Sequence, residues 1–224
     1  MTLEPTLTAA LPPRISELAE RIAARGGRAL AVGGWVRDQL LGADPADLDI
    51  EVHGLSAAEL DDMLAEFGPV HLIGRSFAIR RVRGIAADLS WVEPPAGSAP
   101  LQDDDLEAHF AQAARRRDLT INAMGFDPLT GRLFDPASGR ADLASRHLRF
   151  VDEARFGDDP LRAFRVAQLA ARLEMAPDDA LIALCARQDL ASIAGERLMN
   201  EWTSLLMLAR RPSVALEWLE RMDQ

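Results

Sequence analysis

Apolar positions at helical spacing alternate with short apolar runs along the first half of the chain. Residues 13–25 place apolar side chains at helical spacing between a proline pair and a Gly-Gly stop, which predicts an opening helix. The runs RALAV and LDIEV predict strands, and residues 71–92 predict further strands around Gly74 and Gly84. SAAELDDMLAEFG starts with a Ser N-cap and has Glu three residues later, a capping box that predicts another helix. Together these patterns predict an α/β unit.

The pattern changes in the second half. Residues 103–118 predict a helix, and residues 120–135 predict a hairpin around a Pro-Leu-Thr-Gly turn. From Asp158 onward the apolar spacing is helical almost throughout. We therefore expect two domains, an α/β domain over residues 1–150 and an all-helical domain over residues 151–224.

The composition is that of a folded, soluble protein. Of the 224 residues, 48% are hydrophobic and 27% are charged, which excludes a disordered chain or a fibre. No apolar run approaches the roughly 20 residues that span a bilayer, and the N-terminus lacks the pattern of a signal peptide. Cys185 is the single cysteine, so it forms no internal disulfide, and we expect it to be a small core residue on a helix. These features predict a cytoplasmic protein with no membrane partner.

The net charge of −10 argues at first sight against a nucleic-acid partner. Almost all of the excess negative charge lies in the first half of the chain, however, and every basic residue is Arg. Arg is the better bidentate partner for phosphates and base edges. The charge balance is therefore neutral evidence on nucleic-acid binding.

The first candidate for chemistry is Asp47-Leu48-Asp49 at the head of an expected strand. Because side chains alternate along a strand, both carboxylates lie on one face, with Cα atoms about 6.5 Å apart. Such a pair can share two divalent ions roughly 3.5 to 4 Å apart, the arrangement used for in-line phosphoryl displacement. Taken alone, the pair is also what an ordinary acidic turn contains.

A second candidate lies just upstream, in the string Gly33-Gly34-x-Val36-Arg37-Asp38 between a strand and a helix. Glycines allow backbone N–H groups to approach a triphosphate, and the N-terminus of a helix favours the anion. Arg37 can add a bidentate contact to a phosphate. The alternative is an ordinary strand-to-helix turn.

These residues match a family. The stretch GGWVRDQLLGADPADLDIEVHG resembles the head of the class II tRNA nucleotidyltransferases (CCA-adding enzymes) and bacterial poly(A) polymerases, members of the polymerase β superfamily. RRRDLTINAM then resembles the family's RRD motif, which implies that Arg117, Asp118 and Asn122 contact the incoming nucleotide. FDPASGRADL is similar to the hinge between head and neck, with Arg140 where the family more often has Gly, which implies a stiffer hinge. The implied fold is a polymerase β-like head, with a mixed, mostly antiparallel sheet and helices, followed by an all-helical neck.

A further motif, Asp158-Asp159-Pro160-Leu161-Arg162, resembles the family's EDxxR motif. Asp159 and Arg162 are three residues apart and so share a helix face. One accepting carboxylate and one donating guanidinium suit cytosine and adenine and misfit guanine and uracil. The resemblance implies a protein template for CTP and ATP, with Arg165 facing the triphosphate. An Asp before Pro is also a good helix cap, which is the structural alternative.

The remaining candidates have weaker signals. Asp88 is either a third carboxylate that faces the metal ions or an ordinary strand residue, and the sequence favours neither. The run Arg80–Arg83 either contacts RNA phosphate or forms a solvated strand edge. The four histidines have no metal-ligand spacing, so we expect surface or core positions for them. A stretch similar to the family's neck motif predicts core positions for the following residues: Leu198, Trp202, Leu205, Leu206 and Leu208.

The function predicted from the sequence is a metal-dependent transfer of CMP, AMP or both from CTP and ATP to an RNA 3′ end, with tRNA as the expected acceptor. Asp47 and Asp49 are the predicted catalytic residues and ligands of two Mg²⁺ ions, with Asp88 as the candidate third ligand. Family members are generally longer, with body and tail domains, so we expect a partner protein or a second copy of the chain to replace them. The alternatives are a transferase that modifies a protein or small molecule, and a non-catalytic nucleotide- or RNA-binding module.

Overall fold

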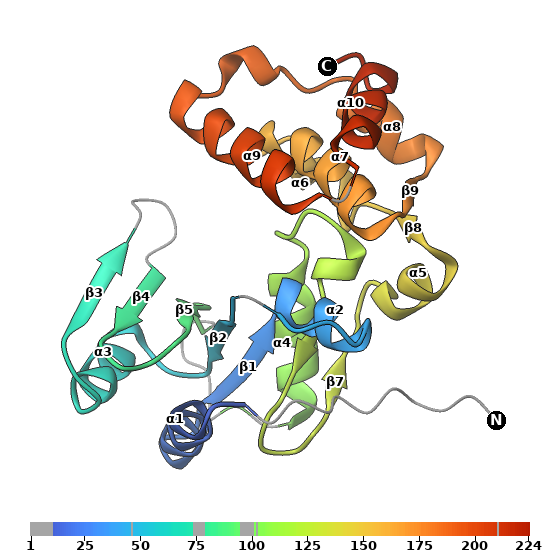
Figure 1. Cartoon of the computed structure of the whole chain (residues 1–224). Coiled ribbons are helices and arrows are strands. Elements are labelled where there is room, and N and C mark those ends of the chain that lie inside the picture. The colour runs from blue at the N-terminus through green and yellow to red at the C-terminus, as the bar shows by residue number, and fades with distance from the viewer. Residues whose placement is uncertain (1–10, 46, 74–78, 95–100, 102, 210) are drawn as a thin grey trace. The chain divides into compact units, whose positions relative to one another are not determined.

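The computed structural model describes residues 11–45, 47–73, 79–94, 101, 103–209 and 211–224. These residues form two compact units (Figure 1). Unit 1 contains the described residues up to Ala114 together with Met124–Pro136, and unit 2 contains Arg115–Ala123 together with Ala137–Gln224. Two segments that the sequence placed in the first domain, Arg115–Ala123 and residues 137–150, therefore fold with unit 2. Strands form on both sides of Gly74, as expected, whereas Gly74 itself and the N-terminal ten residues lie outside the described residues.

Unit 1 is built on one sheet. Its strands among the described residues are β1 (Arg28–Val32), β2 (Asp49–His53), β3 (Val70–Ile73), β4 (Ile79–Val82), β5 (Asp88–Trp91), β6 (Gly125–Phe126) and β7 (Leu133–Phe134). They lie in the order β3-β4-β5-β2-β1-β6-β7 (Figure 1). Only β2 and β5 pair in parallel, and the other neighbouring strands are antiparallel. The prediction of a mixed, mostly antiparallel sheet is confirmed.

Within the described part of unit 1, four helices accompany the sheet: α1 (Pro13–Ala24), α2 (Gly34–Leu40), α3 (Ala57–Ala65) and α4 (Asp103–Ala114). The apolar stripe of α1 buries Ile15, Leu18 and Ile22, and this helix contacts both β1 and α3. The predicted capping box is present at the start of α3, where the Ser56 hydroxyl accepts from Glu59 N and the Glu59 carboxylate accepts from Ser56 N. None of the described helices is long and apolar enough to cross a membrane.

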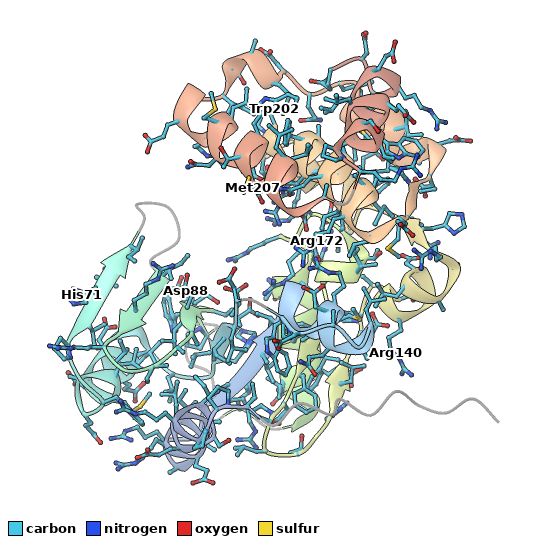
Figure 2. All side chains as sticks on the ribbon, in the orientation of Figure 1. His71, Asp88, Arg140, Arg172, Trp202 and Met207 are labelled. Atoms are coloured by element: carbon cyan, nitrogen blue, oxygen red, sulfur yellow. The ribbon has the colours of Figure 1, made fainter. Side chains whose placement is uncertain are left out.

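In the part of unit 2 that the structure describes, helices are accompanied by one short parallel strand pair, β8 (His147–Leu148) with β9 (Ala176–Pro177), and by an isolated antiparallel bridge between Leu119 and Phe150. Its helices among the described residues are η1 (Thr120–Asn122), α5 (Gly139–Ser145), α6 (Glu153–Phe156), α7 (Leu161–Leu173), α8 (Asp179–Cys185), η2 (Leu190–Ser192), α9 (Gly195–Leu208) and α10 (Pro212–Arg221). Its core lies where α7 packs against α9 and α10, and Trp202 (labelled in Figure 2) stacks edge-on against Phe164 with ring centroids 4.7 Å apart. Cys185 is buried on α8, as expected.

Two local predictions are wrong. Leu205 is fully buried, but Leu206 is 58% exposed, because a one-residue step rotates a side chain about 100° around a helix and turns it away from α7. The first part of the expected hairpin, Thr120–Asn122, forms a 3₁₀ turn, and strand β6 begins only at Gly125. The Leu208 side chain lies outside what the structure describes.

Candidate functional site

A cavity of about 510 Å³ opens in unit 1 beside the end of β2. Its lining comes from β2, β3, β4 and β5 and the turns next to them. The residues are Asp47, Leu48, Asp49, His71, Arg81, Val82, Arg83, Ile85, Ala86, Ala87 and Asp88. Three carboxylates and three basic side chains therefore share one cavity.

The strand alternation at the start of β2 places the two predicted catalytic carboxylates in this cavity. Asp47 and Asp49 are exposed, whereas Leu48 and Ile50 between and after them are buried. Because successive side chains of an extended chain point to opposite faces, Asp47 and Asp49 share the exposed face. The sequence-based expectation about their common face is met, and their catalytic role stays a prediction.

The sheet register brings a third carboxylate next to this pair. Asp49 is the direct partner of Asp88 in the parallel β2–β5 ladder. The antiparallel pairing of Arg80 with Leu89 places Arg81 opposite Asp88, and Arg81 in turn pairs with His71 of β3. One row across four neighbouring strands is thus formed by His71, Arg81, Asp88 and Asp49. Figure 2 labels His71 on β3 and Asp88 on β5.

Asp88 is held by a bidentate ion pair. The Arg81 Nε and Nη2 atoms donate to the two carboxylate oxygens of Asp88 at 2.5 and 2.7 Å. The hydrogen bond to Asp88 is the main cause that raises the pKa of Arg81 above its ordinary value, and the negative charges of Asp88 and, more weakly, Asp47 act in the same direction. The guanidinium therefore stays charged and partly neutralises the acidic end of the cavity.

The carboxylates present fit a hard divalent cation. Carboxylate oxygens are ligands that Mg²⁺ prefers, and it is usually bound through one or two carboxylates together with substrate phosphates. Asp47 and Asp49 meet that requirement from the chain's side. Within the described ranges, no group of three or more His, Cys, Asp or Glu side chains is placed to hold a metal ion, so Asp88 as a third ligand stays a prediction.

The Gly33-Gly34 turn connects β1 to α2. Gly33 has φ 73° and ψ −139°, a conformation that is essentially restricted to glycine. A Cβ atom on Gly34 would lie 3.1 Å from Arg37 Nη2, so the guanidinium packs directly against the turn. Arg37 is buried and its Nε donates to buried Asp38 at 2.8 Å, while the Gly33 N–H points to the Met124 carbonyl at 3.4 Å. Asp38 therefore orients Arg37, and a contact of Arg37 with phosphate stays a prediction.

In unit 2, the predicted nucleotide-binding residues of the RRD-like motif come together. Asp118 is buried, and its Oδ1 accepts from Leu119 N at 2.8 Å and from Asn122 Nδ2 at 3.1 Å. Arg165 Nη2 of α7 lies 3.0 Å from Asp118 Oδ2. Burial by itself would raise the pKa of Asp118, but the charge of Arg165 and these hydrogen bonds outweigh it and hold the pKa below its ordinary value. Asp118 is thus a fixed anion that orients Arg165. Arg117 belongs to the same segment of unit 2.

The two predicted base-reading residues stand at the start of α7, each held by partners of its own. Asp159 Oδ1 accepts from Leu161 N at 3.2 Å, although Pro160 and not Asp159 is the N-cap of α7, and Asp159 Oδ2 accepts from Arg197 Nη2 at 2.8 Å. Arg162 donates from Nη1 to the Arg155 carbonyl and from Nη2 to the Arg116 carbonyl, both at 2.6 Å. Both side chains keep further lone pairs or N–H groups for a ligand.

Sequence reasoning missed two supporting groups in unit 2. The first is Glu201 of α9, which is half-buried and has a raised pKa, chiefly because of burial. The nearby charges of Arg165 and Arg197 lower this pKa, and those of Asp159 and Asp118 raise it. The signal was present in the neck-like motif, where Glu196, Arg197 and Glu201 are the charged positions.

The second missed group is Asp142 in the hinge-like motif. It is fully buried and accepts a hydrogen bond from Thr120 Oγ1 at 2.5 Å, and Arg149 donates to its other oxygen. A Cβ atom on Gly139 would overlap the Thr120 carbonyl oxygen. The motif therefore fastens η1, and with it Asn122, inside unit 2.

The histidines occupy the surface and core positions expected. His53 is buried between Glu51 and His109, at 3.0 and 3.2 Å, and burial followed by the charge of His53 lowers the pKa of His109. His147 is exposed on β8, and exposed His71 lines the cavity.

Comparison with known proteins places this geometry in a family. A family model described as the poly A polymerase head domain matches residues 29–149, more than half of the chain. The Multifunctional CCA protein of Leptothrix cholodnii is 38% identical over 212 residues, which cover 86% of this chain and 46% of that protein. The CC-adding tRNA nucleotidyltransferase of Geobacter sulfurreducens is 35% identical over 205 residues, which cover 90% of this chain and 45% of that protein.

The fold comparison agrees. The solved structure of the Thermotoga maritima CCA-adding enzyme complexed with tRNA matches with a TM-score of 0.79 and 24% identity, over 97% of this chain and 53% of that one. The chain thus spans about half the length of the relatives it matches. The resemblance indicated by the sequence motifs is confirmed, and the chain belongs to the poly A polymerase head domain family, which it shares with the CCA-adding enzymes.

Proposed function

We propose that this chain is an RNA nucleotidyltransferase that adds CMP, AMP or both, from CTP and ATP, to the 3′ end of tRNA. The observation that carries the proposal is the exposed pair Asp47 and Asp49 at the start of β2, where both line a cavity. It is supported by the names of the relatives, one a multifunctional CCA protein and one a CC-adding tRNA nucleotidyltransferase. The names of these relatives differ in the nucleotides added, so the assay has to determine whether this chain adds C, A or both.

Polymerase β-type nucleotidyltransferases are generally metal-dependent, and we assign two Mg²⁺ ions to this site, with Asp47 and Asp49 as ligands and Asp88 as the third candidate. Bound there, Mg²⁺ would lower the pKa of the attacking 3′-hydroxyl and offset the charge that develops on the phosphates. The chain contributes the two carboxylates already oriented on a strand. Arg81 restrains Asp88 until a ligand competes for it.

Each unit carries residues that we assign to nucleotide binding. In unit 1, buried Arg37 packs against the Gly33-Gly34 turn, and Asp38 fixes its orientation. In unit 2, Asn122 donates to Asp118, Asp118 in turn holds Arg165, and we assign Arg165 and Arg117 to the sugar and phosphates of the nucleotide. The donors are placed before the substrate binds, so little ordering is needed at the moment of reaction.

Base selection is assigned to Asp159 and Arg162. The Asp159 carboxylate accepts from the exocyclic amino group of cytosine or adenine, and Arg162 donates to the neighbouring ring nitrogen. Arg197 and the carbonyls of Arg116 and Arg155 hold the two side chains in place. Guanine and uracil present a carbonyl and an N–H at the same positions and would leave both protein groups without a partner.

The assay is incubation with labelled CTP, ATP, GTP or UTP and tRNAs that end before the first C, after CC, or with complete CCA. Incorporation of C or A into the incomplete tRNAs supports the proposal. Labelling of a protein or small molecule, or tight binding without turnover, would support one of the two alternatives instead. We also place the protein in the cytoplasm, where an enzyme of tRNA maturation would act, and a fractionation blot tests that assignment.

Substitutions test the roles. Asp47→Ala or Asp49→Ala should abolish transfer and leave the fold intact, because both side chains are exposed. Asp44→Ala is the matched control, since Asp44 is an exposed carboxylate of the same turn that does not line the cavity. Full activity in either cavity variant would refute the metal scheme.

The base-reading assignment has its own test. Arg162→Ala should reduce the preference for C and A over G and U more than it weakens triphosphate binding, and Arg187→Ala, an exposed Arg of the same unit, should change neither. Unchanged selectivity in Arg162→Ala would refute the template assignment.

A further inference from the structure

We propose that the basic half of the cavity, formed by His71, Arg81 and Arg83, binds the phosphate backbone of the acceptor RNA immediately upstream of its 3′ end. The inference rests on the proposed function and extends it, since it names the surface of unit 1 that receives the second substrate.

The cavity has two halves of opposite charge. Asp47, Asp49 and Asp88 line the side formed by β2 and β5, and the basic half lines the side formed by β3, β4 and the turn after β4. Neighbouring strands lie about 4.8 Å apart. The sheet row therefore places Arg81 about 10 Å and His71 about 14 Å from Asp49, measured across the strands. An RNA strand whose 3′-hydroxyl is at the carboxylates would lie with its last phosphates over the basic half.

Strand alternation divides the run Arg80–Arg83 into two kinds of residue. Arg80 is buried, and its guanidinium binds Asp61 of α3. Arg81 and Arg83 are exposed and line the cavity, with buried Val82 between them. Arg80 thus has a structural role, and only the alternate arginines of the run are available to a ligand.

The basic half has hydrogen-bond donors to spare. Arg81 uses Nε and Nη2 for Asp88, so its Nη1 still faces outward from that pair. Among the described residues, the side chains of His71 and Arg83 have no hydrogen-bond or ion-pair partner. Guanidinium and imidazole groups are suitable donors to phosphate oxygens. Exposed, unengaged donors beside a catalytic carboxylate pair fit an anionic ligand that binds and leaves.

The sheet order indicates which anion this is. In an in-line displacement, the attacking and leaving oxygens lie on opposite sides of the phosphorus atom. Strand β2 has β1 and its Gly33-Gly34 turn on one side and β5, β4 and β3 on the other. With the triphosphate at the glycine turn, the attacking hydroxyl approaches from the β5 side. The phosphate one sugar upstream of that hydroxyl then falls on β4 and β3, so the basic half meets RNA and not the leaving pyrophosphate.

The test compares the wild-type chain with the double variant His71→Gln, Arg83→Gln, which leaves the Arg81–Asp88 pair in place. Arg21→Gln is the matched control, because Arg21 is an exposed Arg of the same unit outside the cavity. Fluorescence anisotropy measures the Kd of a labelled tRNA lacking its terminal A at several salt concentrations, with no nucleotide present. A separate titration measures the Kd of CTP. Circular dichroism and the urea midpoint confirm that each variant is folded.

We expect the double variant to weaken RNA binding about 5- to 20-fold and to lower the salt slope by about 0.7, the value for one phosphate contact on a single strand. The Kd of CTP should change less than about 2-fold, and Arg21→Gln should resemble the wild type. The inference is overturned if RNA binding is unchanged, if CTP binding weakens instead, or if Arg21→Gln weakens RNA binding equally.

The same measurements separate this inference from the proposed function. A wild-type protein that binds tRNA but transfers no nucleotide refutes the proposed reaction, and the binding comparison still decides the role of the basic half. A wild-type protein that binds no tRNA refutes both.

Discussion

Gly139 is expected to be intolerant of any side chain, although its backbone conformation is ordinary. It is the first residue of α5, and a Cβ atom there would overlap the Thr120 carbonyl oxygen and lie 3.0 Å from the Thr120 carbonyl carbon and 3.2 Å from Ile121 Cα. All three atoms are backbone, so no rotamer change can relieve the contact. Overpacking of this kind costs about 1 to 3 kcal/mol. Alanine's better helix propensity, worth at most about 1 kcal/mol in a helix interior, offsets only part of it.

We therefore expect Gly139→Ala to lower the free energy of unfolding by about 1 to 2 kcal/mol, a fall of about 0.5 to 1 M in the urea midpoint followed by far-UV circular dichroism. Hydrogen exchange of the Asn122 and Ala123 amides, which close the turn on Leu119 and Thr120, should accelerate. Gly195→Ala is the matched control. Gly195 also begins a helix of unit 2, but nothing lies within 4 Å of its added Cβ, so this variant should be neutral or slightly stabilised. Equal midpoints for the two variants would refute the steric reasoning.

Three further predictions follow from single side chains. Asp118→Asn should destabilise the fold by about 2 kcal/mol at neutral pH, because hydrogen bonds to a buried charge are lost. The pKa of Asp118 is depressed in the folded protein, so the stability that its charge contributes is complete above the unfolded pKa near 4 and is lost as the pH falls through the folded pKa. The difference in unfolding free energy between wild type and Asp118→Asn should therefore narrow below about pH 4. A difference that stays constant with pH would contradict this role of Asp118. Ser56→Ala removes the capping box of α3 and should cost about 1 kcal/mol in urea unfolding, with Ser56→Asp restoring most of it. Burial raises the pKa of Cys185 to about 12, so a disulfide reagent should leave the native thiol unmodified at mildly alkaline pH and react with it fully in urea; rapid reaction of the native protein would contradict its burial.

The elements that could be predicted from sequence are those whose determinants are local. The capping box at Ser56 and Glu59 needs residues three apart, and the Asp47–Asp49 face follows from the alternation of a single strand. The apolar spacing of α7 likewise predicted a buried face, and Phe164 and Leu161 lie on it. The family motifs added an expected role for each position, which periodicity alone does not supply.

What could not be predicted depends on partners far apart in the sequence. Asp118 meets Arg165, and the Arg162 guanidinium meets the Arg116 carbonyl 46 residues away. The local pattern of residues 115–123 is the same whether the segment ends a helix and starts a hairpin in unit 1 or packs in unit 2, so it could not predict the second. In the same way, only the sheet register shows that Arg81 opposes Asp88 while its neighbour Arg80 turns inward to Asp61.

The interleaved path of the chain also restricts how such a protein can be cut or exchanged by evolution. The segment Arg115–Ala123 belongs to unit 2 but is encoded inside the stretch that builds unit 1. A gene fragment starting at codon 137 would express the C-terminal helices without the Asp118 carboxylate and without the carbonyl that anchors Arg162. Recombination of contiguous gene blocks would therefore separate α7 from the groups that hold Arg165 and Arg162, so we expect the two halves to be inherited together.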